Sequence, residues 1–190
     1  MLKLDDSIES KLIRKKLIED YPFLLPRNRF TDEVATDYKY EYIEGEFDLP
    51  VGWFELFLQM CEDIKEPLEK ADCLEKFRFS QIKEKYGSMR AYVFGAPQEV
   101  YDIISKYEFL SQQVCCMCGK PAEYMTSGWI SPFCKEHVYE LVKDTSSCDD
   151  IEIDTCFYVT CYYIDGHSTE TKIDCSSEWQ RYLERIGESL

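Results

Sequence analysis

The 190-residue sequence predicts an α+β fold in which helices pack on β-hairpins around a small embedded module rich in cysteine. Apolar residues recur at helical spacing over residues 53–68, which is typical of a helix that faces a core. Side chains alternate at strand spacing around turn signals at Gly87 and Gly166, as expected for two hairpins. Four cysteines and one histidine gather within residues 115–137, which indicates a compact module of their own.

Four segments have the periodicity of amphipathic helices. The first has a polar cap candidate at Ser7 and ends at Pro22. The third has Pro97 in its first turn and carries apolar residues as far as Val114, and the last, "SSEWQRYLERIG", begins with a serine cap candidate. The second helix is the clearest, and its apolar stripe is expected in the core: Trp53, Phe57, Met60, Cys61, Ile64 and Leu68.

The two hairpins have different turn signals. In "EKFRFSQIKEKYGSMRAYVFG", Phe77 and Phe79 alternate with polar residues, and residues 86–88 supply the turn. In "TCFYVTCYYIDGHSTETKID" the turn is expected at residues 165–166, where Asp precedes Gly. His167 follows this turn, and we interpret it as a turn residue in preference to a general base because no nucleophile pairs with it in the sequence.

Two matched pairs of potential metal ligands lie in "CCMCGKPAEYMTSGWISPFCKEH". Cys115 and Cys118 are separated by two residues, and Gly119 gives the backbone the freedom that a turn around a metal needs. After fifteen intervening residues, Cys134 and His137 repeat the two-residue gap. This spacing indicates zinc, because thiolates and imidazole suit Zn²⁺ better than Mg²⁺ or Ca²⁺. Four protein ligands leave no coordination position for water or substrate, so the zinc is predicted to be structural.

The sequence around these ligands favours a treble clef, with a plain zinc ribbon as the alternative. The residues before Cys134 have the pattern of a strand and turn, and "CKEHVYELVKD" has that of a helix start, so the second pair would lie on the first helical turn. Cys116 is expected to point away from the metal, and a free thiol is its second interpretation. The remaining cysteines are expected as small core residues, because disulfides are rare in the cytosol: Cys61, Cys73, Cys148, Cys156, Cys161 and Cys175.

With the zinc module placed, the chain divides into three regions that we expect to pack as one compact unit. Residues 1–112 form an N-terminal α+β region, residues 113–145 the zinc-binding module, and residues 146–190 a C-terminal β-hairpin and helix. The N-terminus lacks the apolar core of a signal peptide, and no apolar run approaches the length that spans a bilayer. We therefore expect a cytoplasmic protein with no membrane partner.

Charge and motif content bear on function. Thirty-seven acidic and 22 basic residues give a net charge of −15, which repels nucleic acid at long range and favours basic protein partners. The sequence contains none of the G-x-S-x-G, P-loop, H-E-x-x-H or Rossmann patterns. Carboxylates are so numerous that pairs of them carry no information. We therefore expect a protein that is not an enzyme.

Three motifs in order resemble a family of small, largely uncharacterised proteins of bacteriophages, prophages and bacteria. The motifs are "GWFELFLQMCEDI", "FSQIKEKYGSMRAYVFG" and "CMCGKPAEYMTSGWISPFCKEH", and the resemblance covers residues 20–140. The family combines a G-W helix, a Q-x-K-E-K-[FY]-G-x-[LM]-R-x-Y hairpin and a C-x₂-C-G…G-W…C-x₂-H zinc module. The resemblance implies a fold and a zinc site, with the ligands at the four positions above, more than an activity. A phage gene would place the protein in the host cytoplasm.

Two classes of function remain open. In the first, a zinc-stabilised interaction protein binds a host or other partner protein through an acidic, aromatic surface. The candidate contacts are Tyr38, Tyr40, Tyr42, Glu41, Glu44 and Glu46. In the second, the protein binds nucleic acid through the basic hairpin at residues 76–90, whose candidate phosphate contacts are Lys83, Lys85 and Arg90. The same hairpin offers Tyr86 and Tyr92 for stacking on bases.

Overall fold

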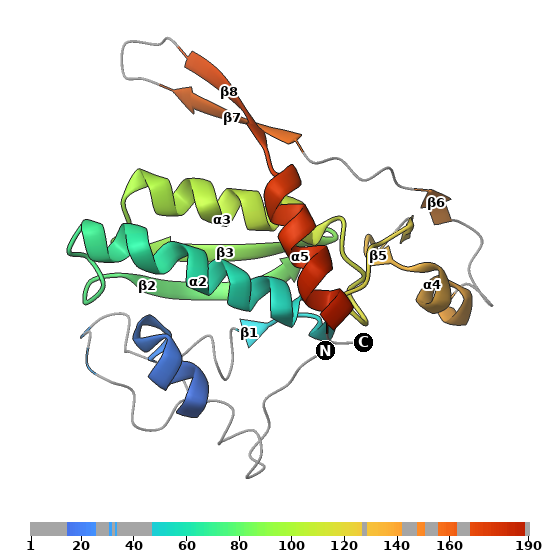
Figure 1. The fold of residues 1–190 in the computed structure, drawn as a ribbon, viewed down its shortest axis with the longest axis horizontal. Helices are drawn as coiled ribbons and strands as arrows, with labels where there is room; N and C mark the ends of the chain where they lie inside the picture. Colours follow the sequence, from blue (N-terminus) through green and yellow to red (C-terminus); the bar gives the residue numbers. More distant parts are fainter. Residues whose placement is uncertain are drawn as a thin grey trace.

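In the computed structural model of this chain, helices cover one side of a three-stranded mixed sheet, and two further small sheets are antiparallel, so the predicted α+β class is confirmed (Figure 1). The structure describes residues 15–25, 31, 33, 47–126, 129–141, 148–150, 156–162 and 168–188. The elements of the first half are η1 (Pro22–Leu24), β1 (Phe47–Asp48), η2 (Val51–Trp53), α2 (Phe54–Lys70), β2 (Arg78–Lys85), β3 (Ser88–Phe94) and α3 (Gln98–Ser111). Those of the second half are β4 (Tyr124–Thr126), β5 (Pro132–Phe133), α4 (Lys135–Leu141), β6 (Cys148–Asp150), β7 (Cys156–Tyr162), β8 (Ser168–Asp174) and α5 (Ser176–Glu188).

The β2–β3 hairpin forms as predicted. Its strands pair in antiparallel register from Arg78 opposite Phe94 to Lys85 opposite Ser88, with a bulge after Phe79. Tyr86 and the following glycine make the two-residue turn, and both have positive φ angles, 54° and 75°. That is the backbone of a type I′ turn, whose twist matches the twist of the two strands. β1 adds to the other edge of β2 in parallel.

Two helices close the core over this hairpin. All six residues of the predicted α2 stripe have no exposed surface, which confirms that this stripe faces the core. α3 adds Val100, Ile104 and Tyr107 to the same cluster, and the hairpin contributes Ile82 and Met89. Pro97 lies one position before α3 and is not in its first turn, a small correction that leaves its role at the start of the helix intact.

α3 also caps the exposed edge of β3. The backbone N–H of Met89 donates to Ser111 Oγ at 2.7 Å, and that of Ala91 donates to Glu108 Oε1 at 2.8 Å. The second oxygen of Glu108 pairs with Arg90 at 2.8 Å. An edge strand normally leaves such N–H groups open to another chain, so these side chains protect this stretch of the edge.

The strands and helix predicted near the C-terminus form, whereas the turn predicted at residues 165–166 lies outside the described residues. β7 and β8 pair in antiparallel register, and α5 follows directly. The predicted serine cap is corrected, because Asp174 Oδ1 accepts the backbone N–H of Ser176 at 2.9 Å and the carboxylate therefore caps the helix. An ion-pair cluster ties α5 to α2 and α3, with Lys106 Nζ 3.2 Å from Asp63 and 3.5 Å from Glu178. Among the described helices, none has the length and apolar character needed to cross a membrane.

Candidate metal centre

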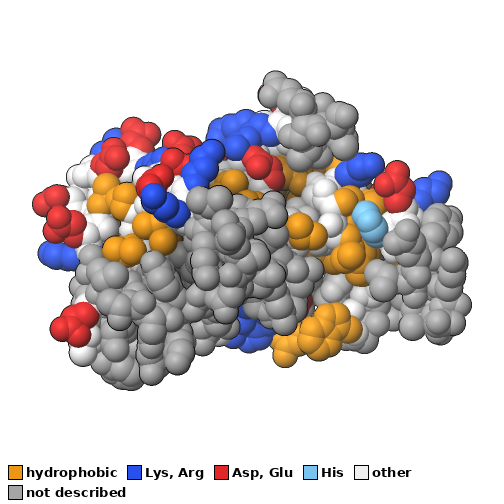
Figure 2. Space-filling view, turned by 90° about the horizontal axis from the view of Figure 1, so that it is seen from below, with side chains coloured by type: hydrophobic (Ala, Val, Ile, Leu, Met, Phe, Trp, Pro, Cys, Tyr) orange, Lys and Arg blue, Asp and Glu red, His pale blue; other side chains and the backbone are white. Residues whose placement is uncertain are grey.

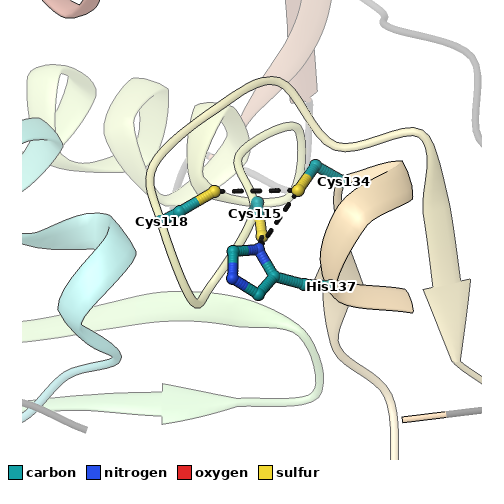
Figure 3. Close-up of side chains that lie close together, drawn as sticks. All are labelled: Cys115, Cys118, Cys134 and His137. Carbon is teal, nitrogen blue, oxygen red and sulfur yellow. Dashed lines mark hydrogen bonds between the residues drawn. The ribbon is translucent and has the colours of Figure 1, made fainter. Parts of the chain in front are cut away.

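Four side chains meet at one point, as their spacing predicts. One ligand atom from each of Cys115, Cys118, Cys134 and His137 lies within 4.8 Å of every other (Figure 3). The sulfurs of Cys118 and Cys134 are 3.7 Å apart. His137 presents Nδ1 to the sulfurs, at 3.2 Å from Cys134 and 3.7 Å from Cys115. The cluster is therefore compatible with a metal site.

The first ligand pair lies on a tight backbone turn. The N–H of Cys115 donates to the carbonyl oxygen of Lys120 at 2.8 Å, and the N–H of Gly119 donates to that of Cys115 at 3.0 Å. Gly119 has a φ of 78°, which glycine adopts without the steric cost that a Cβ atom imposes. We name residues 114–121 the knuckle. A β-bridge between Val114 and Pro121 closes it.

The second ligand pair lies at the start of a helix, reached through a short hairpin. β4 pairs with β5, Cys134 follows β5 directly, and α4 begins at the next residue. The N–H of His137 donates to the carbonyl oxygen of Cys134 at 3.1 Å, so the first helical turn fixes the separation of these two ligands. Knuckle, hairpin and helix start therefore follow one another in the order that the sequence predicts.

The knuckle is docked on the rest of the protein. The N–H of Gly52 donates to the carbonyl oxygen of Cys116 at 3.0 Å. The Trp53 indole N–H donates to the carbonyl oxygen of Val114 at 2.8 Å. The hydroxyl of Tyr182 in α5 donates to the carbonyl oxygen of Gly119. The knuckle, residues 52–53 and α5 are therefore in contact, although they are distant from one another in sequence.

Close approach explains the glycine at position 52. A Cβ atom there would lie 2.1 Å from the carbonyl oxygen of Cys115 and 2.7 Å from the backbone nitrogen of Gly119. Neither neighbour is a flexible side chain, so a larger residue would displace the knuckle. The family resemblance included the Gly52-Trp53 pair but not the reason for it, because the reason is a contact between segments about sixty residues apart.

Burial differs among the five cysteine and histidine side chains here. Cys115 and Cys134 are buried, His137 is half-buried and Cys118 is exposed at the rim. Desolvation of the sulfur, with the Cys115 and Cys134 sulfurs nearby, raises the pKa of the Cys118 thiol to about 12 when no metal is bound. Cys116 is 7% exposed, and burial raises the pKa of its thiol to about 12, so it stays protonated near neutral pH. Cys116 is outside the four-residue cluster, as predicted, and its thiol is free but buried.

The structure describes only some of the residues that the sequence predicts as partner contacts. Lys83 and Lys85 lie on β2, whereas Arg90 is held by Glu108. The acidic contacts predicted at residues 38–46 lie outside the described residues, as does His167. Two features escaped sequence reasoning. Tyr182 contacts the knuckle from the last helix, and Trp129 stands 78% exposed in the β4–β5 loop.

Comparison of the chain with protein-family models, with curated proteins and with solved structures finds no match. The resemblance to small phage and bacterial proteins therefore stays a prediction, and the case for function depends on the geometry described above.

Proposed function

We propose that this chain is a non-enzymatic binding protein whose binding surface is held in place by a structural zinc ion. The four-ligand cluster is the observation that carries the proposal. Zn–S bonds of about 2.3 Å and Zn–N bonds of about 2.0 Å at tetrahedral angles place two sulfurs about 3.8 Å apart and a sulfur and nitrogen about 3.5 Å apart. The sulfur–sulfur separation of 3.7 Å and the sulfur–nitrogen separations of 3.2 and 3.7 Å fit those values.

The donor set supports a structural role for the ion. Three thiolates and an imidazole complete a tetrahedron, which leaves no open position for a reacting water. A metal bound at this point stabilises the knuckle and the start of α4, and through the knuckle the docking of Gly52, Trp53 and Tyr182. Binding free energy at such a site contributes directly to folding free energy.

The partner is proposed from charge and from exposed aromatic side chains. A basic partner protein would suit the net charge of −15 and the acidic, aromatic segment at residues 38–46. The alternative, nucleic-acid binding through the β2–β3 hairpin, is favoured by one specific observation: Lys85, Tyr86 and Tyr92 are all exposed there. On the face in Figure 2, acidic and basic side chains are interspersed around exposed hydrophobic ones, so a partner of either charge would find complementary groups.

Metal analysis tests the proposal. Protein purified without chelator should contain one zinc per chain, measured by elemental mass spectrometry, and Cys118→Ser should lose most of it. Cys73→Ser is the matched control, because Cys73 is a half-buried cysteine outside the cluster and should leave the zinc content unchanged. Substoichiometric zinc in the wild-type protein, or full retention in Cys118→Ser, would contradict the proposal.

A further inference from the structure

The outer face of the β2–β3 hairpin differs in charge from the chain as a whole. α2 and α3 cover the inner face (Figure 1), and alternate residues of each strand point the other way. Tyr92 and Phe94 on this outer face are 43% and 55% exposed. The charged residues at the outward positions of the two strands are all basic: Arg78, Lys83, Lys85 and Arg90. A surface of this kind complements an anionic partner.

The metal module extends this surface by one aromatic residue. The β4–β5 loop meets the hairpin turn so closely that a Cβ atom at Gly87 would lie 2.8 Å from Ile130 Cγ2. A cavity of about 420 Å³ lies at the junction, lined by Lys83, Glu84, Lys85, Tyr86, Trp129 and Ile130. The Glu84 carboxylate accepts the backbone N–H of Gly87 at 2.7 Å, so one of its oxygens is already engaged at the turn. Trp129 is 78% exposed and Tyr86 73% exposed, so both rings are open to a partner.

The backbone at Tyr86 is an independent indication of function. Its φ of 54° lies in the left-handed region, where a turn of this type favours asparagine or glycine over a bulky residue. The aromatic side chain makes no compensating core contact, because it is largely exposed. An unfavourable backbone that holds an exposed ring at a loop tip points to use of that ring in binding.

Two of the basic side chains stand beside exposed rings. Lys85 Nζ lies 5.5 Å from the centre of the Tyr86 ring, and Lys83 Nζ lies 5.5 Å from that of Tyr92. Within the described part of the chain neither lysine has an ion-pair partner, whereas Arg90 is committed to Glu108.

We propose that this surface, formed by Lys83, Lys85, Tyr86, Tyr92 and Trp129, binds single-stranded nucleic acid. Bases stack on the exposed Tyr86 and Trp129 rings, and the adjacent ammonium groups contact phosphates. Unpaired bases have both faces available for stacking, whereas duplex bases are already stacked on one another. An acidic peptide would satisfy the lysines but would leave the rings without a flat partner. The inference develops the alternative partner named above and rests on the proposed metal site, because the metal module positions Trp129.

The net charge of −15 sets the strength of the interaction. At physiological salt, charges separated by more than about 8 Å are largely screened, so the distant acidic residues do not abolish local contacts with phosphate. Each phosphate contact to a single strand contributes about −0.7 to the slope of log K against log salt concentration. Two lysine contacts therefore predict a slope of about −1.4 and binding that is weak at physiological salt.

Fluorescence anisotropy with the zinc-loaded protein tests the proposal. A labelled single-stranded oligouridylate or oligothymidylate of about ten residues should bind at low salt, and a duplex of the same length should bind more weakly. Trp129→Ala should weaken binding about 5-fold to 150-fold, as expected for loss of one base stack, and Lys85→Gln should reduce the salt slope by about 0.7. Val51→Ala is the control, because Val51 is an exposed apolar residue in η2 outside this surface, and the variant should bind as the wild type does.

Other outcomes overturn the proposal. Absence of binding at low salt, or wild-type affinity in Trp129→Ala, would remove this surface as a nucleic-acid site. Equal displacement of the oligonucleotide by a polyglutamate peptide would assign the surface to an acidic protein instead. Zinc content and thermal midpoint are measured on each variant, and both should match the wild type. Failure of the metal prediction is thereby distinguished from failure of the binding prediction.

Discussion

The indole N–H of Trp53 donates a hydrogen bond to the carbonyl oxygen of Val114, the residue immediately before Cys115, the first of the four candidate metal ligands. Both groups are buried, and the donor and acceptor lie 61 positions apart in sequence. The start of the main core helix and the metal knuckle are therefore parts of one structure. Four predictions follow the consequences of this coupling.

Replacing Trp53 with phenylalanine should lower the free energy of unfolding and weaken metal retention together. The change removes the only side-chain donor described for the Val114 carbonyl oxygen, and an unsatisfied buried acceptor costs about 1–3 kcal/mol. Urea unfolding followed by circular dichroism measures the first effect, and competition with a zinc chelator measures the second. Trp129→Phe is the control, since an exposed substitution should change stability by no more than about 0.5 kcal/mol. Equal behaviour of the two variants would refute the coupling.

Gly52→Ala should be more damaging than its size suggests. The new methyl group would lie 2.1 Å from a backbone oxygen of Cys115, and the backbone on both sides would have to move. The expected loss is at or above the upper end of the range of about 1–3 kcal/mol for overpacking. The neighbouring Val51→Ala, at a position that is 41% exposed, should have little effect. Differential scanning calorimetry of both variants measures the two losses of stability. An equally small loss in Gly52→Ala would show that the knuckle accommodates the methyl group and would contradict the prediction.

Tyr182→Phe should destabilise the docking of α5 while sparing the hairpin core. The variant keeps the buried ring and its stack on Trp179 but loses the hydroxyl that donates to the Gly119 carbonyl oxygen. The expected cost is about 1–3 kcal/mol in the free energy of unfolding, because a buried acceptor loses its donor. Hydrogen exchange should show faster opening in α5 and the knuckle, with β2, β3 and the centre of α3 unchanged. Uniform acceleration throughout the protein would contradict a local role.

Removing the metal should loosen the knuckle, α4 and the contacts at Gly52 and Tyr182, while most far-ultraviolet circular dichroism persists. The buried stripe of α2 and the hairpin core do not depend on the ligands for their packing. Lowering the pH should release the metal, because protons compete with it for three thiolates and an imidazole. Titration from pH 8 to pH 4 with a chromogenic zinc indicator measures this release. Metal retained at the lowest pH, or complete loss of secondary structure on chelation, would contradict the expectation.

The site was more predictable from sequence than its surroundings because its signals are local. Two ligand pairs with two-residue gaps specify a tight turn and a helix start, and both depend on backbone geometry within a few residues. The α2 stripe and the first hairpin are local in the same sense. The docking of Trp53 and Tyr182 on the knuckle is not, since the partners lie 61 and 63 positions apart. The cap of α5 was assigned to serine because serine suits such positions, whereas Asp174 performs the role from two residues upstream.

The hydrogen bonds from the β3 edge to Glu108 and Ser111 also bear on the order of folding. The Ala91–Glu108 contact spans 17 positions, whereas the Trp53–Val114 contact spans 61. Because loop-closure entropy grows as about 1.5 RT times the logarithm of loop length, the longer closure costs about 1 kcal/mol more. The β2–β3 hairpin and α3 can therefore pair at a low cost in loop-closure entropy, and their contacts do not involve the metal site. We expect the docking of the knuckle on Trp53 to follow, so that metal supply acts on a late step of folding and not on the initial collapse.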